Sequence, residues 1–436
     1  MNLFLISLKL KGFPIKKAID DLKEIKSLQH ADFEAWVERK KWEQFDFHKK
    51  HNAFYRSYLG SNEIRRWEDI PIITKAELQR PLKQLISEGY FLNDLFVNNT
   101  SGSSGTPFFF AKDKYAHAIT WANVIDRYSE HGIEYGKSLQ ARFYGIPLKG
   151  LKYYKEKGKD ILSARVRFPV FDLSNIVLKD YVKKFARRPF EYINGYTSAL
   201  VYFAQYLISN KIVLKSICPS LRVVFPTSEM CSSHDREIME RGFGVPVANE
   251  YGCAEMDVLA FEDPNNNWTL SEANVFFEVV DDQNNLLPIG SEGNLIITSL
   301  HNKAMPLIRY KLGDVAIINP VRLGNKLVLE KVIGRTNEFA LLPSGKKVPA
   351  LTFYYITKTL IQQEFGVKEF VVKQLLANTF QFDYVADQEL SVAAIQKIKK
   401  AMDDYLEPEL KALFIKKQKI DRSPSGKFKQ FECLID

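Results

Sequence analysis

The 436-residue chain contains only four cysteines, and no two of them form a Cys-x-x-Cys pair. This scarcity excludes a small disulfide-stabilised secreted scaffold and favours a reducing compartment such as the cytoplasm. Cys231 and His234 lie three residues apart and Cys253 follows, but residues 256–263 add neither Cys nor His. We therefore expect no zinc site at these cysteines.

The sequence also lacks a hydrophobic run of the roughly 20 residues needed to cross a bilayer. The N-terminal apolar run, from Leu3 to Leu10, contains Lys9 and has neither a positive region before it nor a cleavage site after it. The net charge is +9, but acids and bases are interspersed, and no basic–aromatic motif of a nucleic-acid-binding module is present. We expect a cytoplasmic protein with no membrane and no nucleic acid as partner.

Internal repeats are absent, and the chain is too long for one typical core, so two or more domains are expected. Residues 16–58 have apolar positions three and four apart, which predicts helices. Thr74 and Glu77 then form a capping-box pattern. From residue 91 to about 332, strand-like runs alternate with helical segments, which predicts α/β layers with a β-rich part over 276–318. The runs read as strands are 193–200, 221–226, 245–248 and 295–299.

A change of pattern near Gly334-Arg335-Thr336-Asn337 indicates a domain boundary. The following hundred residues contain a predicted strand over 367–375, a helix over 390–406 and a strand over 413–420. We expect a large domain of layered α/β sheets over 1–333 and a small α+β domain over 334–436.

Residues 100–106 form a loop of hydroxyl residues and glycines that precedes Pro107. Glycines let backbone amides converge, and amides and hydroxyls together can hold the oxygens of a triphosphate. No Gly-Lys-Ser/Thr follows directly, so this is not a Walker A loop. The loop residues are Thr100, Ser101, Gly102, Ser103, Ser104, Gly105 and Thr106.

Four further segments follow this loop in the chain. The first three are Glu250-Tyr251-Gly252-Cys253-Ala254-Glu255, Pro306-Leu307-Ile308-Arg309-Tyr310-Lys311-Leu312-Gly313-Asp314 and the Gly-Arg pair at 334–335. The fourth is Ser423-Pro424-Ser425-Gly426-Lys427, nine residues before the C-terminal Asp436. A lone Lys after Gly suits delivery of a movable positive charge.

In their order and rough spacing, the five segments resemble the adenylate-forming enzymes, the acyl-CoA synthetase superfamily. The resemblance is to phenylacetate–CoA ligase and its relatives from capsular-polysaccharide loci, and it covers nearly the whole chain. It implies an ATP- and acid-binding N-terminal domain and a mobile C-terminal lid. The implied cofactors are ATP, Mg²⁺ and CoA.

The resemblance also implies individual roles. Tyr251 would place its ring against adenine, and Glu255 would help hold Mg²⁺, as a carboxylate suits. Asp314 would accept hydrogen bonds from both ribose hydroxyls. Arg335 would reach the ribose or a phosphate, and Lys427 would neutralise charge between the substrate carboxylate and the α-phosphate. Other residues expected to bind nucleotide are those of the loop 100–106 with Ser228, Glu229, Glu250 and Gly252.

Two departures from the family pattern stand out. Many adenylate-forming enzymes have Lys where this chain has Thr106, so one positive charge near the pyrophosphate is missing. Asn337 stands where an Asp is common, which keeps the hinge hydrogen bonds but changes their charge. Glu255 and Lys427 remain the expected catalytic residues.

The acid pocket is expected at two aromatic segments that line the acid side in relatives, and their aromatic content suits an aryl or short apolar acid. The pocket candidates are Tyr144, Gly145, Asn194, Gly195 and Tyr196.

The predicted activity is ATP-dependent conversion of a carboxylic acid to an acyl-adenylate, followed by transfer to CoA as an acid–thiol ligase. Two alternatives stay open. The acyl group could pass to an amine or an acyl carrier protein in surface-polymer or secondary-metabolite synthesis, or the chain could be an inactive nucleotide-binding relative. The sequence leaves the acid, the acceptor and the oligomeric state open.

Overall fold

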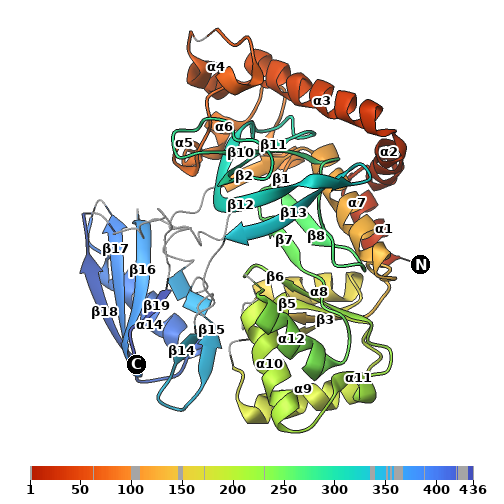
Figure 1. Cartoon of the computed structure of the whole chain (residues 1–436). Helices are drawn as coiled ribbons and strands as arrows, with labels where there is room; N and C mark the ends of the chain where they lie inside the picture. Colours follow the sequence, from red (N-terminus) through yellow and green to blue (C-terminus); the bar gives the residue numbers. More distant parts are fainter. Residues whose placement is uncertain are drawn as a thin grey trace. The chain divides into compact units, whose positions relative to one another are not determined.

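The computed structural model describes residues 2–61, 63–99, 109–145, 151–170, 172–229, 231–333, 339–349, 352–353, 356–357, 367–386, 388–418, 420 and 431–435. These residues divide into two compact units. The first contains residues 2–99, 109–137 and 248–333, and the second contains residues 138–247 and 339–435. Most elements of both are labelled in Figure 1.

The first unit opens with helices, as the apolar spacing predicts. They are α1 (Leu3–Leu10), α2 (Ile15–Ser27), α3 (His30–His51) and α4 (Ala53–Leu59), followed by η1 (Trp67–Asp69), α5 (Lys75–Leu78), α6 (Leu82–Leu85) and η2 (Leu92–Asp94). Thr74 is the N-cap of α5 and forms the predicted capping box with Glu77. No helix among the described residues is long and apolar enough to cross a membrane.

Strands β1 (Phe96–Asn99) and β2 (Phe109–Lys112) form an antiparallel pair on either side of the loop predicted to hold phosphates. Helix α7 (Lys114–Glu130) follows, with Asp113 accepting hydrogen bonds from the amides of Tyr115 and Ala116 as its N-cap. The N-cap therefore starts α7 directly after the last residue of β2.

A seven-stranded antiparallel sheet completes the first unit, in the order β10-β11-β12-β13-β9-β8-β7. This confirms the β-rich stretch predicted around residues 276–318. Its apolar core includes Ile73, Phe110, Leu259, Leu295 and Tyr310, none of them exposed. The strands are β7 (Glu250–Cys253), β8 (Asp257–Glu262), β9 (Trp268–Leu270), β10 (Val275–Val280), β11 (Glu292–Ser299), β12 (Tyr310–Leu323) and β13 (Lys326–Ile333).

The second unit contains a parallel sheet with strand order β4-β3-β5-β6. The chain passes from β3 to β4 on one side and returns to β5 on the other, so β3 and β5 flank a topological switch point. The strands are β3 (Gln140–Phe143), β4 (Arg165–Phe168), β5 (Tyr192–Tyr196) and β6 (Val223–Thr227), and the helices are α8 (Leu151–Leu162), α9 (Asn175–Arg187), α10 (Thr197–Ser209), α11 (Leu214–Ile217) and α12 (Ser233–Phe243). The sheet confirms the predicted α/β layering.

The C-terminal residues form a small α+β arrangement with its own core. Its sheet has the order β18-β17-β16-β19, and α14 packs against one face through Ala394, Ile398 and Met402. The elements are β14 (Phe339–Leu341), β15 (Lys347–Pro349), β16 (Val367–Leu376), β17 (Thr379–Ala386), α14 (Val392–Tyr405), β18 (Lys411–Lys416) and β19 (Phe431–Cys433). The expected boundary at residues 334–337 lies outside the described residues and stays a prediction.

Some predicted strands have different limits. The run at 193–200 is a strand only to Tyr196, which is the N-cap of α10. The run at 245–248 contributes one isolated bridge, between Val224 and Val247. The run at 413–420 begins earlier and ends at Lys416. Apolar content alone does not separate a strand from the first turn of a buried helix.

Three buried histidines stabilise the first unit in their neutral form. Burial lowers the pKa of His48, His117 and His301 from 6.5 to about 4. His48 bridges Ser87 and the carbonyl of Asn302, and His301 donates to the carbonyl of Ala273. Each ring is neutral when folded, whereas the unfolded chain takes up a proton near pH 6.5.

We therefore expect these histidines to leave the free energy of unfolding unchanged above pH 6.5. Below pH 6.5 the free energy of unfolding should fall as the pH approaches 4. Between these values the unfolded state binds up to three more protons than the folded state through these rings, and each proton contributes up to about 1.4 kcal/mol per pH unit. Urea unfolding at pH 7.5, 6.5, 5.5 and 4.5 measures the slope. His48→Gln should reduce it by up to one proton, and a free energy of unfolding independent of pH in this window would contradict the assignment.

Candidate active site

The Tyr-Gly segment folds as strand β7 and the turn into β8. An added Cβ at Gly252 would lie 2.2 Å from the carbonyl oxygen of Asp257, so only glycine permits this close approach of the strands. Asp257 adopts a left-handed backbone with φ 60°, which is unusual for a residue with a side chain. The turn residues Ala254, Glu255 and Met256 are thus held in one conformation.

Glu255 is buried at this turn, with 2 % of its surface exposed. The hydroxyl of Tyr310, at the start of β12, donates to Oε1 of Glu255 at 2.7 Å. Burial and the adjacent Glu255 raise the pKa of Tyr310 well above its usual range. Tyr310 is therefore a neutral hydrogen-bond donor near neutral pH.

Asp314 lies four residues after Tyr310 on the same strand. The hydroxyl of Tyr251 donates to Oδ2 of Asp314 at 2.8 Å. The structure therefore brings Tyr251, Glu255 and Asp314 together in the first unit, and their contacts with a nucleotide stay predictions. A third tyrosine, Tyr128 of α7, donates to Glu250 at 2.8 Å.

Arg309, just before Tyr310, is buried, and its contacts hold the segment around Tyr310 in place. Its guanidinium pairs with Glu278 and donates to the carbonyls of Glu68 and Ile70 at 2.7 and 2.8 Å. Burial raises the pKa of Glu278, and the positive charge of Arg309 opposes this shift. Arg309 also has a left-handed φ of 46°, a strained backbone that this buried network maintains.

The chain before the phosphate loop is joined to the same strand. Ile73 forms a parallel bridge with Tyr310, its amide donating to the carbonyl of Arg309 and its carbonyl accepting from the amide of Lys311. Residues 70–74, Ile-Pro-Ile-Ile-Thr, thus have a structural role: they connect the N-terminal segment to strand β12.

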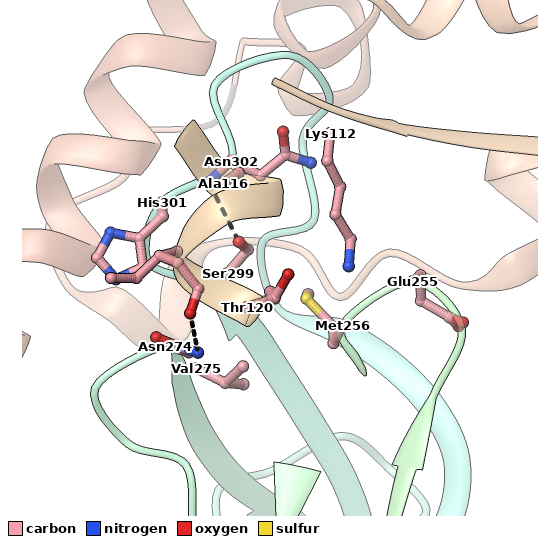
Figure 2. A pocket seen from close by; sticks show the side chains of 11 residues that line it. Lys112, Ala116, Thr120, Glu255, Met256, Asn274, Val275, Ser299, His301 and Asn302 are labelled. Atoms are coloured by element: carbon pink, nitrogen blue, oxygen red, sulfur yellow. Dashed lines mark hydrogen bonds between the residues drawn. The ribbon is translucent and has the colours of Figure 1, made fainter. Parts of the chain in front are cut away.

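Lys112 was not predicted from the sequence. It ends β2, is buried with 2 % of its surface exposed, and forms an ion pair with Asp257. Lys112 and Glu255 both line a pocket that also reaches α7 and the ends of β10 and β11 (Figure 2). The remaining lining residues are Ala116, Ile119, Thr120, Met256, Asn274, Val275, Ser299, His301 and Asn302.

The second unit presents aromatic rings at the carboxyl ends of β3 and β5. The ring centroids of Tyr144 and Tyr196 lie 4.5 Å apart, and the guanidinium of Arg142 lies 4.2 Å from the Tyr144 ring. These ends flank the switch point, where parallel α/β sheets usually bind ligands. Tyr144 and Tyr196 therefore stay candidates for the acid pocket, as does the adjacent Gly145.

Asn194 and Gly195 have structural roles in the same strand. Asn194 is buried and donates to the carbonyl of Phe225 at 3.1 Å. A Cβ at Gly195 would lie 2.5 Å from Cβ of Phe143, so β3 and β5 can pair closely only with glycine here. Their contact with an acid stays a prediction.

Ser228 and Glu229 follow β6. Ser228 has a left-handed φ of 69°, and Glu229 accepts a hydrogen bond from the amide of Ser198 in the first turn of α10 at 2.7 Å. Burial raises the pKa of Glu229 even though this amide stabilises the carboxylate. Glu229 thus caps α10, and the expected nucleotide contacts of both residues stay predictions.

Three predicted parts lie outside the described residues: the loop from Thr100 to Thr106, Arg335 with Asn337, and Lys427. The chain on either side of Lys427 is described. Ile420 packs on Val371 and Val385, on the sheet face opposite α14, and Phe431 begins the edge strand β19. The segment that carries Lys427 therefore connects two fixed points of the C-terminal sheet.

No protein-family model matches the chain. Protein CapK of Staphylococcus aureus is 26% identical over 336 residues, which cover 72% of this chain and 71% of CapK. Phenylacetate-coenzyme A ligase of Aromatoleum evansii is 28% identical over 131 residues, 28% of this chain and 29% of that ligase. An open conformation of 2-hydroxyisobutyryl-CoA ligase, in complex with 2-HIB-AMP and CoA, shares the fold with a TM-score of 0.56 at 16% identity, covering 94% of this chain and 93% of that one.

The chain is thus similar in sequence to CapK and to phenylacetate-coenzyme A ligase, and it shares the fold of a CoA ligase. The predicted resemblance and fold class are thereby confirmed. The sequence alone did not indicate Lys112, nor where Arg309 and Tyr310 lie relative to the acids. The local sequence gives Lys112 little distinction, because it follows the apolar run 108–111 and is itself followed by Asp113 and Lys114.

The residues around Glu255 fit a magnesium ion. The Glu255 carboxylate is buried, and none of the ion pairs formed within the described part of the chain includes it. Buried carboxylates are normally paired or bind metal. Mg²⁺ is usually held by one or two carboxylates together with substrate phosphates. Among the described residues, no three His, Cys, Asp or Glu side chains gather into a metal cage, so the nucleotide would supply the other ligands.

We expect Lys112→Met to destabilise the protein by about 1–3 kcal/mol, because it leaves Asp257 without its buried partner. The half-exposed position of Asp257 keeps the loss below that of a fully buried pair. Lys114→Met is the matched control, since Lys114 is exposed and its 3.8 Å contact with Asp94 is a surface pair. Urea unfolding of both variants tests this, and equal free energies of unfolding would contradict it.

Proposed function

We propose that this chain activates a carboxylic acid with MgATP and transfers the acyl group to the thiol of CoA. The observation that carries the proposal is the cross-linking of two motifs by Tyr251–Asp314 and Tyr310–Glu255. These bonds bring the Tyr251 ring and the carboxylates of Asp314 and Glu255 together in one unit, and the proposal assigns adenine, ribose and Mg²⁺ to them in that order. Similarity to phenylacetate-coenzyme A ligase and to a CoA ligase that binds 2-HIB-AMP and CoA supports the reaction class.

In the first step a carboxylate oxygen attacks the α-phosphorus of ATP, and the bond to the β-phosphate oxygen breaks. Acyl-adenylate and pyrophosphate form. In the second step the CoA sulfur attacks the acyl carbon, the carbon–oxygen bond to AMP breaks, and the thiol proton is released. Bound Mg²⁺ would neutralise phosphate charge, and Glu255 is the residue that would hold it.

Asp314 would accept hydrogen bonds from the ribose hydroxyls while Tyr251 fixes its orientation. Lys427 would supply positive charge as the phosphorus is attacked, and Arg335 and the loop 100–106 would contact the nucleotide. Tyr144 and Tyr196 favour an aryl or short apolar acid, because two adjacent, mutually tilted aromatic rings offer apolar surface.

Pyrophosphate release over a panel of aryl, short aliphatic, fatty and amino acids, with and without CoA, tests the proposal. Pyrophosphate release with one of these acids, followed by AMP release only when CoA is present, supports the acid–thiol ligase reaction. AMP release with an amine or a carrier protein, but not with CoA, would support the alternative acceptors. Absence of pyrophosphate release with every acid, despite ATP binding, would favour an inactive relative.

Lys427→Ala should slow acyl-adenylate formation by about 10²- to 10³-fold, since one aimed charge donor is lost from the transition state. ATP binding should persist. Lys429→Ala, which removes an equal charge two residues away, is the control and should retain activity within a few fold. ATP–pyrophosphate exchange measures both, and equal rates for the two variants would exclude the special role of Lys427.

Asp314→Ala should weaken ATP binding about 10- to 100-fold, because hydrogen bonds to a charged group contribute about 1.5–3 kcal/mol. Asp46→Ala removes an exposed acid from α3 of the same unit and should leave the affinity unchanged. Calorimetry with ATP compares the two, and a wild-type dissociation constant for Asp314→Ala would remove the ribose assignment.

A further inference from the structure

The two motif segments exchange tyrosines. Tyr251 of the first segment donates to Asp314 of the second, and Tyr310 of the second donates to Glu255 of the first. The two bonds have nearly equal lengths, 2.8 and 2.7 Å, and both join a phenol hydroxyl to a carboxylate. Tyr251 therefore donates to the carboxylate predicted to bind the ribose, and Tyr310 donates to the carboxylate predicted to bind Mg²⁺.

The Tyr310 ring cannot move freely. It has no exposed surface, its backbone pairs with Ile73 and Ile297, and the preceding Arg309 is anchored by Glu278. The acceptor, Glu255, is also held in place. The close strand approach at Gly252 and the ion pair of Lys112 with Asp257 fix the conformation of the β7–β8 turn that carries it. Donor and acceptor are thus presented by two rigid segments.

A bond to one carboxylate oxygen determines the direction of the other. With Oε1 of Glu255 held by Tyr310, rotation about the last side-chain torsion is restricted, and Oε2 keeps a constant direction. We propose that Tyr310 is a positioning residue that orients Glu255 toward the Mg²⁺ of the bound nucleotide. This inference rests on the proposed function and goes beyond it by assigning a residue that does not touch the metal.

A tyrosine suits this role better than a lysine or arginine would. A cation at the same place would neutralise Glu255 and weaken its attraction for Mg²⁺, whereas a neutral hydroxyl orients the carboxylate without cancelling its charge. Residues that hydrogen-bond a metal ligand commonly change metal affinity by about 10- to 100-fold when they are removed.

The test compares ATP affinity in the presence of Mg²⁺ and in the presence of EDTA, by calorimetry on the full chain. Tyr310→Phe should raise the Mg²⁺ concentration needed for half-maximal ATP binding by about 10- to 100-fold. Its affinity for ATP in EDTA should stay at the wild-type value. Tyr251→Phe should behave differently and weaken ATP binding by a similar factor with and without Mg²⁺, because its partner is Asp314.

Tyr55→Phe controls for loss of a buried hydroxyl, since within the described residues the Tyr55 hydroxyl has no hydrogen-bond partner. It should leave the Mg²⁺ requirement unchanged. In a double-mutant cycle, Tyr310→Phe should have no further effect on the Mg²⁺ requirement once Glu255→Gln is present. Additive effects of the two substitutions would overturn the inference.

Thermal unfolding of each variant confirms folding at the assay temperature. If Tyr310→Phe does not fold, Glu255→Asp provides the second variant, because it withdraws the carboxylate from the hydroxyl and retains the buried ring. An unchanged Mg²⁺ requirement in whichever of these folds would overturn the positioning role. Absence of any Mg²⁺ effect on ATP binding by the wild type would instead overturn the proposed function, so the two failures are distinguishable.

Discussion

The candidate site depends on neutral hydrogen-bond donors that restrain carboxylates. Tyr251 and Tyr310 each place a hydroxyl on an acid from the other's motif, so neither acid can be oriented unless both segments are folded. Each bond contributes only about 1–3 kcal/mol, but its directional effect is larger than its energy suggests. Because the donors are uncharged, the acids keep their negative charge for a ligand, which salt bridges would have reduced.

These restraints require a scaffold that is itself costly to build. Burying Arg309 and Glu278 removes two charges from water, and such pairs seldom stabilise a protein more than apolar packing of equal volume. Their benefit here is geometric. The guanidinium fork reaches Glu68, Ile70 and Glu278 at once, so the N-terminal segment, the strained backbone at Arg309 and the following Tyr310 have a single arrangement.

Local rules explain what the sequence could predict. Helical spacing over residues 16–58, the capping box of Thr74 and the turn chemistry around the β-rich stretch each depend on residues a few positions apart. The resemblance located the acids but not their partners. Tyr310 and Glu255 are 55 residues apart, and Lys112 and Asp257 are 145 apart, so no periodicity relates them. The predicted end of strand β5 was wrong for a related reason. The apolar run continues past Tyr196 into α10, and its apolar character does not show where the strand ends and the helix begins.

The distribution of charge also bears on why a cation would be placed on a separate segment. Glu250, Glu255 and Asp314 are acids of the first unit. Two of the tyrosines that donate to them, Tyr251 and Tyr310, belong to the seven-stranded sheet. A lysine fixed among them would pair with an acid, as Lys112 does with Asp257, and would then be unable to follow a developing negative charge. If Lys427 acts as proposed, a lysine on a segment separate from these acids would avoid that neutralisation. Under the proposed function, Thr106 and Lys427 are compatible: hydroxyls orient the acids, and Lys427 would supply the positive charge when the substrates bind.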